Sequence, residues 1–330
     1  MAEQSLLEAI REGLHEEMAR DPAVYMLGED VALGGPFGVT AGLAEAFGTQ
    51  RVVNTPISEG AVMGLAIGAA AVGLRPVIEI MFIDFITLAM DQLVNHAAKL
   101  HYMSGGQLKI PLTVRVQCGI SGNMGAQHSQ SLEAWLAHVP GLKVVTPSCP
   151  ADAKGLIKAA IRDDNPVVFI EHRGLYWARG EAAGAGAAVT PIGEAAVLRE
   201  GEHITIATFG RQVAAALEAA AELAPQGISA EVIDLRSLQP LDMDTLVESV
   251  RKTGRLLVVH EAVSEGGIGA EIAMRVQQAA FYDLDGPILR LAAPFSPIPA
   301  SSALDRFFVP GKAEILRAVR GAFRRQGAGG

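Results

Sequence analysis

Cysteine is scarce in this chain, and the motifs of several common protein classes are missing. The chain has two cysteines, Cys118 and Cys149, both in apolar surroundings, which does not support a disulfide framework. The histidines and cysteines show neither an HxxxH pattern nor a paired-cysteine spacing, which argues against a zinc site. The glycine-containing segment "GISGNMG" lacks the Lys-Ser/Thr pair of a phosphate-binding Walker loop.

A surplus of positive charge is also missing. The chain has 27 basic and 36 acidic residues, a formal net charge of −9 and a pI of about 5.4. A nucleic-acid interface would require a basic stripe. The one basic cluster, residues 317–326, is interpreted as the solvated face of a helix. We therefore expect no nucleic-acid partner.

Long hydrophobic runs are absent as well. The uncharged stretch from Ala61 to Leu74 is too short to span a bilayer and is rich in glycine and alanine. The first residues, "MAEQSLLEAIREGL", have the pattern of an acidic amphipathic helix rather than of a secretory signal. These features predict a cytoplasmic protein with no membrane partner.

What the chain does contain is a regular alternation of strands and helices. Half of its 330 residues are hydrophobic, and this length suits two domains. Near-continuous apolar strands separated by helices predict parallel sheets covered on both faces, and hence an α/β fold. Strands are expected at residues 23–30, 51–56, 76–82, 111–119, 142–148 and 166–172, and then at 203–210, 229–236, 255–262 and 288–294.

The alternation is interrupted once, by a segment rich in glycine and alanine. Residues 181–202 have no hydrophobic periodicity and are interpreted as an interdomain linker. The prediction is a first parallel-sheet domain over residues 1–180 and a second over residues 203–330.

Several side chains with chemical potential follow the expected strands of the first domain. Ligands of open parallel sheets bind at the carboxyl ends of strands, where Glu59, Phe85 and His128 are expected. Each residue also has a purely structural explanation. Glu59 can be a helix N-terminal acid favoured by the helix dipole, His128 a loop histidine bonded to backbone, and Phe85 a core residue.

Taken together and in order, the motifs point to one family. They are "TPISE", "RPVIEIMFIDF", "MDQLVNHAAKLHYMSGG", "AQHSQS", "PGLKVVTPS", "DAKGLIKAAIRDDNPVVFIEH" and "VIDLRSLQPLDMDT". The chain closely resembles the β subunit of the thiamine-diphosphate-dependent decarboxylating component of 2-oxo-acid dehydrogenase complexes, from about residue 5 to residue 320. The resemblance implies a transketolase-like fold, with a thiamine-diphosphate pyrimidine-binding domain followed by a transketolase C-terminal-like domain.

The resemblance also implies roles for individual residues. Glu59 matches the glutamate that contacts N1′ of the cofactor's aminopyrimidine, where a carboxyl favours the tautomer that can take a proton. Phe85 matches the aromatic residue that stacks on the pyrimidine, with Ile57 and Met81 as apolar walls. His128 matches the active-site histidine, which holds the oxo-acid carboxylate or assists proton transfer during reductive acylation of a lipoyl group.

One family motif is absent, and another site is implied. The Gly-Asp-Gly motif that holds the diphosphate and Mg²⁺ does not occur, so an α subunit is expected to supply that half of the site. The resemblance also places a possible K⁺ ion in this chain. Its expected ligands are the backbone carbonyls of Leu112, Ala160, Ile161 and Asp163, together with Asn165.

The resulting hypothesis is a catalytic β subunit in an α2β2 heterotetramer that shares thiamine diphosphate with its α subunit. It would decarboxylate a 2-oxo acid, with pyruvate favoured, and transfer the acyl group to lipoyl-lysine on an acyltransferase core. Alternatives are an acetoin or branched-chain 2-oxo-acid dehydrogenase β subunit, the C-terminal half of a split transketolase, or a non-catalytic assembly subunit. The motif "AQHSQS" resembles the pyruvate and acetoin types, whereas "MFIDF" and "EHRGLYW" favour the acetoin or general types.

Overall fold

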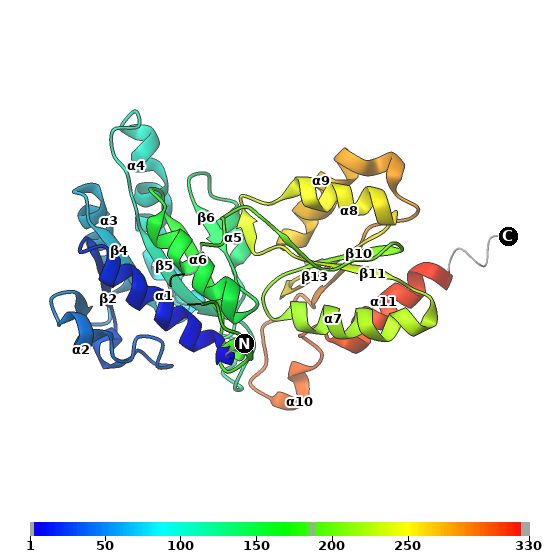
Figure 1. The fold of residues 1–330 in the computed structure, drawn as a ribbon, viewed down its shortest axis with the longest axis horizontal. Helices are drawn as coiled ribbons and strands as arrows, with labels where there is room; N and C mark the ends of the chain where they lie inside the picture. The colour runs from blue at the N-terminus through cyan, green and yellow to red at the C-terminus, as the bar shows by residue number, and fades with distance from the viewer. Residues whose placement is uncertain (1–2, 185, 187–188, 325–330) are drawn as a thin grey trace.

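Two sheets, one built mainly from each half of the chain, organise the molecule (Figure 1). The structure is a computed structural model that describes residues 3–184, 186 and 189–324. The outer ends of the predicted domains, residues 1–2 and 325–330, lie outside the described residues, as do residues 185, 187 and 188 of the predicted linker.

The first sheet has seven strands in the order β12-β6-β7-β5-β4-β2-β3. All neighbouring strands are parallel except β12 and β6, which are antiparallel. The six strands predicted for the first domain are confirmed. β12, Ser237–Gln239, belongs to the second half of the chain. It pairs with β6 and so adds an edge strand to the sheet of the first half. The other strands are β2 (Val24–Gly28), β3 (Val52–Asn54), β4 (Arg75–Ile80), β5 (Thr113–Cys118), β6 (Lys143–Val145) and β7 (Val167–His172).

Helices cover both faces of this sheet. α1 (Leu6–Arg20) and α6 (Pro150–Arg162) pack together on one face, and α3 (Glu59–Ala71) belongs to the core on the other. α1 begins with a capping box, in which Ser5 and Glu8 satisfy each other's backbone amides. α6 begins at a proline, whose missing amide proton has no cost in the first turn.

Residues 83–103 do not form one continuous α-helix, although their apolar spacing predicts one. The segment is a 3₁₀ helix (Ile83–Ala89), a π-helical stretch (Asp91–Ala97) and a short α-helix, α4 (Ala98–Met103). It approaches α3 closely, since a Cβ at Gly60 would lie 3.1 Å from the carbonyl oxygen of Leu88. Apolar spacing over so few turns does not separate these helix types, and π-helical stretches often occur near functional sites.

The second sheet has five strands in the order β14-β13-β10-β11-β9. The four predicted strands are confirmed as β10 (Ile204–Thr208), β11 (Ala230–Asp234), β13 (Leu256–Val263) and β14 (Leu289–Ala293), all parallel. β9 (Ala196–Arg199) lies within the predicted linker but pairs antiparallel with β11. This short edge strand is partly exposed along its length, and its brief apolar run follows a glycine- and alanine-rich segment without periodicity.

The helices of the second domain also form two layers. α7 (Gln212–Leu223) and α11 (Lys312–Arg324) pack on one face of the five-stranded sheet, and α8 (Met243–Thr253) and α9 (Ile268–Ala280) pack together on the other. The remaining elements are β1 (Glu3–Ser5) paired with β8 (Arg179–Glu181), and the short helices α2 (Leu43–Phe47), α5 (Glu133–Ala137) and α10 (Ser302–Asp305). No helix among the described residues is long and apolar enough to cross a membrane.

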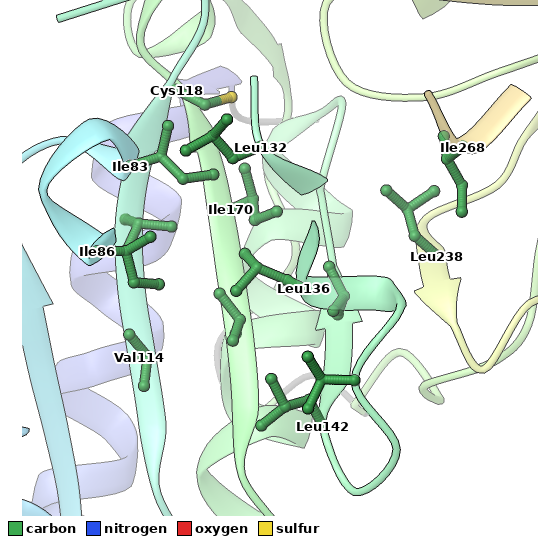
Figure 2. Close-up of a cluster of buried hydrophobic side chains, with 14 of the residues drawn as sticks. Ile83, Ile86, Val114, Cys118, Leu132, Leu136, Leu142, Ile170, Leu238 and Ile268 are labelled. Atoms are coloured by element: carbon green, nitrogen blue, oxygen red, sulfur yellow. The ribbon is translucent and has the colours of Figure 1, made fainter. Parts of the chain in front are cut away.

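One hydrophobic core connects the two domains. It contains Ile83, Leu136 and Ile170 of the first domain together with Leu238 and Ile268 of the second, as Figure 2 shows. All five side chains are at least nine-tenths buried. The domains are therefore packed against each other by apolar side chains, which fixes how the second domain meets the strand ends of the first.

Candidate active site

Three aromatic rings meet at the carboxyl ends of β4 and β5. Phe82 and Phe85 follow β4, and His128 lies in the loop that follows β5. The ring centroid of His128 lies 4.8 Å from that of Phe82 and 5.2 Å from that of Phe85, with both pairs edge to face. The structure thus brings together two of the residues that the sequence placed in the site, Phe85 and His128.

Arg173 anchors the loop that carries His128. Its guanidinium donates hydrogen bonds to the carbonyl oxygens of His128 (3.0 Å), Gly119 (3.3 Å) and Ser121 (2.5 Å). The same group lies over the ring of Phe82, 5.3 Å from its centroid. Arg173 was not among the site residues predicted from the sequence. The only signal was a charged residue directly after the apolar strand β7.

Asp84 anchors the other end of the same loop. Its Oδ1 accepts hydrogen bonds from the backbone amide (3.3 Å) and the side chain (2.9 Å) of Gln130. The carbonyl of Gln130 in turn accepts from the amide of Gly119, which closes the loop at its base. Asp84 directly precedes Phe85, so this contact fixes the aromatic segment and the His128 loop relative to each other. This anchoring role of Asp84 was not predicted from the sequence either.

Glu59 is the first residue of α3, where the helix dipole favours a carboxylate. Its side chain is half-buried, and Ser58 before it makes no side-chain cap. Glu29, at the end of β2, is a second carboxyl close to it. Burial, together with the charge of Glu59, raises the pKa of Glu29 above its usual range. The carboxyl groups of Glu29 and Glu59 therefore lie close together at the start of α3.

The other expected cofactor contacts form an open surface on this chain. Ile57 is 81% exposed, and Met81 and Phe85 are half-buried. Among the described residues, buried polar atoms without a partner occur on the segments around them, namely Thr55 Oγ1, Asp84 Oδ2 and Gln92 Oε1. Apolar walls, one acid and unsatisfied polar atoms fit an aromatic heterocycle with a polar edge, and they do not fit a diphosphate.

No group of acidic, histidine or cysteine side chains that could hold a metal ion occurs in the described part of the chain. The expected K⁺ ligands consist mainly of backbone carbonyls, and those carbonyls already accept hydrogen bonds. Arg75 donates to the carbonyl oxygens of Ile161 (3.0 Å) and Asp163 (3.1 Å). The carbonyls of Leu112 and Ala160 accept from backbone amides. Each carbonyl keeps a second lone pair for a cation, but the Arg75 guanidinium places a positive charge beside two of them.

Each half of the chain matches a known protein family. Residues 2–178 match the family described as "Transketolase, pyrimidine binding domain", and residues 193–315 match "Transketolase, C-terminal domain". Among solved structures, "Split gene transketolase, inactive beta4 tetramer" has a TM-score of 0.78 at 26% sequence identity, and the match covers 96% of this chain and 97% of that one.

Two curated relatives are similar over nearly the whole chain. The Acetoin:2,6-dichlorophenolindophenol oxidoreductase subunit beta of Cupriavidus necator is 47% identical, with 96% of each chain covered. The Pyruvate dehydrogenase E1 component subunit beta of Rhizobium meliloti is 46% identical, with 97% of this chain and 70% of the relative covered. The resemblance found in the sequence is thereby confirmed, and the chain belongs to the transketolase-like family of pyruvate and acetoin dehydrogenase β subunits.

Proposed function

We propose that this chain is the catalytic β subunit of a thiamine-diphosphate-dependent 2-oxo-acid dehydrogenase that decarboxylates pyruvate and passes the acyl group to lipoyl-lysine. The observation that carries the proposal is the edge-to-face contact of His128 with Phe85, at strand ends that lie beside the start of α3. The names of the relatives support the reaction class, since one is a pyruvate dehydrogenase subunit and the other acts on acetoin.

Each site residue has a role in this proposal. Glu59 hydrogen-bonds the polar edge of the aminopyrimidine, and Ile57, Met81 and Phe85 contact its faces. His128 binds the substrate carboxylate or moves a proton during acyl transfer. The cofactor, when bound, supplies the stabilisation of the carbanion that decarboxylation produces. The protein supplies position, the exclusion of water and the acid–base groups.

An α subunit completes the site in this proposal. It holds the diphosphate and Mg²⁺, for which this chain offers no suitable cluster among its described residues. The assembly is an α2β2 heterotetramer that docks on a lipoyl-bearing acyltransferase in the cytoplasm.

The test is turnover by the reconstituted complex. The chain is co-expressed with its α subunit. Decarboxylation is measured with pyruvate and branched-chain 2-oxo acids, and oxidation is measured with acetoin, in each case with lipoyl acceptor or an artificial oxidant. Preference for pyruvate with the lipoyl acceptor supports the proposal. Acetoin is the second candidate, because the Cupriavidus necator relative is as similar as the pyruvate dehydrogenase subunit. Absence of turnover with every substrate contradicts both.

The K⁺ site is a separate part of the proposal. K⁺ would bind the carbonyls of Ile161 and Asp163 through their second lone pairs, beside the Arg75 guanidinium. Exchange of K⁺ for choline should then lower the Tm, and crystals grown with Rb⁺ should show anomalous density at the end of α6. Equal Tm values and no Rb⁺ density would instead show that Arg75 alone satisfies these carbonyls.

A further inference from the structure

The first residues of the His128 loop are held from the second domain as well as from the first. Glu261 lies in β13, and its Oε1 accepts a hydrogen bond from the backbone amide of Ile120 (2.5 Å). Arg211, just before α7, donates from Nη1 to the carbonyl oxygen of the same residue (2.9 Å). The second domain therefore binds both backbone polar groups of Ile120, two residues after the end of β5.

A third contact fixes the direction of the Glu261 carboxylate. His172, the last residue of β7, lies with Nε2 2.9 Å from Glu261 Oε2. Its Nδ1 accepts a hydrogen bond from the amide of Gly174 (3.1 Å), so Nδ1 carries no proton and Nε2–H is the donor to Glu261. Burial raises and His172 lowers the pKa of Glu261, and with the Ile120 amide the net result is below the usual range.

The imidazole of His172 also packs directly against the loop. A Cβ at Gly119 would lie 2.1 Å from His172 Nε2, and Gly119 has a φ of +88°, which disfavours any other residue. Gly119 and Ile120 are thus enclosed by His172, Glu261 and Arg211, and the side chains of Glu261 and His172 are almost completely buried.

Packing against the loop is incomplete. A cavity of about 440 Å³ lies beside it, lined among others by Ala126 and Ser129 of the loop and by Glu261 and Phe295 of the second domain. A loop with open space beside it depends on its polar anchors for a single position. We propose that Glu261, assisted by Arg211, is a positioning residue of the second domain that sets the position of His128 through Ile120.

The inference rests on the role proposed above for His128. It also requires a side chain at position 261 that accepts two hydrogen bonds. Both partners of Glu261, the amide of Ile120 and Nε2–H of His172, are donors. A carboxylate accepts from both, whereas an amide has one accepting and one donating end. Glu261→Gln therefore leaves two donors facing each other in either orientation, although its size is unchanged.

A double-mutant cycle in the complex with the α subunit tests the inference. Glu261→Gln should lower kcat with the lipoyl acceptor roughly 10- to 100-fold, the effect expected of a misplaced active-site group, with unchanged thiamine diphosphate affinity. In a His128→Ala background the same substitution should have less than about a twofold effect, because the group that it positions is absent. Equal losses in both backgrounds, or no loss in either, would overturn the inference.

Two further variants and one further measurement complete the test. Arg211→Gln changes a half-buried residue and should act in the same direction as Glu261→Gln, which covers the case in which the latter fails to fold. Glu265→Gln is the matched control and should have no effect, since Glu265 is exposed and its carboxylate accepts a hydrogen bond from the neighbouring Ser264. Hydrogen exchange of residues 119–132 should rise in Glu261→Gln, and unchanged exchange would contradict a positioning role.

The same experiment separates the two proposals. Wild-type activity of His128→Ala removes the proposed role of His128. An impaired His128→Ala enzyme with a fully active Glu261→Gln enzyme leaves that role intact and removes only the positioning by the second domain.

Discussion

The imidazole of His128 stands edge-on to the ring of Phe85, with 5.2 Å between the ring centroids and 86° between the planes. This contact places a titratable group beside the residue proposed to stack on the cofactor. Arg173 and Asp84 hold the two segments that make it, through the loop carbonyls and through Gln130. Arg173 and Asp84 therefore fix the position of the His128 loop relative to the segment that carries Phe85.

His128→Ala should impair acyl transfer to the lipoyl acceptor or substrate capture more than it impairs cofactor binding. The reason is that the imidazole is proposed to act on the substrate side. Activity and thiamine diphosphate affinity are measured on the same complex. His138→Ala, an exposed histidine ten residues further on, is the control. A large fall in affinity with intact chemistry contradicts the assignment.

Glu59→Gln should leave folding and assembly intact while nearly abolishing turnover. Glutamine keeps the size and the hydrogen-bonding capacity of the side chain but cannot share a proton with the aminopyrimidine. The expected loss of kcat is on the order of 10²- to 10⁴-fold, the range of general acid–base effects. Glu45→Gln, at an exposed position of α2, should be neutral. Near wild-type activity of the Glu59→Gln complex would remove this residue from its role.

The fold was largely predictable from the sequence, because its strands are apolar runs bounded by turns. The strands that were not predicted are β1, β8, β9 and β12, which are three or four residues long. β1 and β8 pair only with each other, and β9 and β12 lie at sheet edges, where local composition says little. Glu59, Phe85 and His128 were identified only because each lies within a motif. Arg173 and Glu261 were missed because their roles depend on contacts between distant parts of the chain, over 141 residues for Glu261 and Ile120.

Glu133 should make stability depend on pH near neutrality. This residue, at the start of α5, is 3% exposed, and burial together with the charge of Glu261 raises its pKa to about 7 from the ordinary value of 4.5. The folded state therefore binds this proton more tightly than the unfolded state. Its contribution to the free energy of unfolding is greatest below about pH 4.5 and is lost as the pH rises to about 7.

Glu133→Gln should remove this dependence, because the amide stays neutral. The difference in unfolding free energy between wild type and variant should shift by on the order of 2–3 kcal/mol in favour of the variant between pH 4.5 and pH 7.5. Chemical denaturation at several pH values measures it. Groups facing the carboxyl, Cys118 and Glu261, are unchanged in the variant. Parallel stability curves for the two proteins would show that Glu133 ionises freely in the fold.

The chain alone should neither bind thiamine diphosphate tightly nor turn over any 2-oxo acid. The diphosphate carries several negative charges and needs Mg²⁺ with oxygen ligands, and the net charge of −9 opposes holding it unaided. We expect the exposed face of α3 to belong to the same shared site. Leu65 and Val72 are 61% and 82% exposed, next to exposed glycines that would let another helix approach closely. We expect β–β and α–β contacts on this face in the heterotetramer. Calorimetric titration of the isolated chain with cofactor and Mg²⁺ should give no measurable heat, whereas the chain mixed with its α subunit should bind. Micromolar or tighter binding by the isolated chain would overturn the division of the site between two subunits.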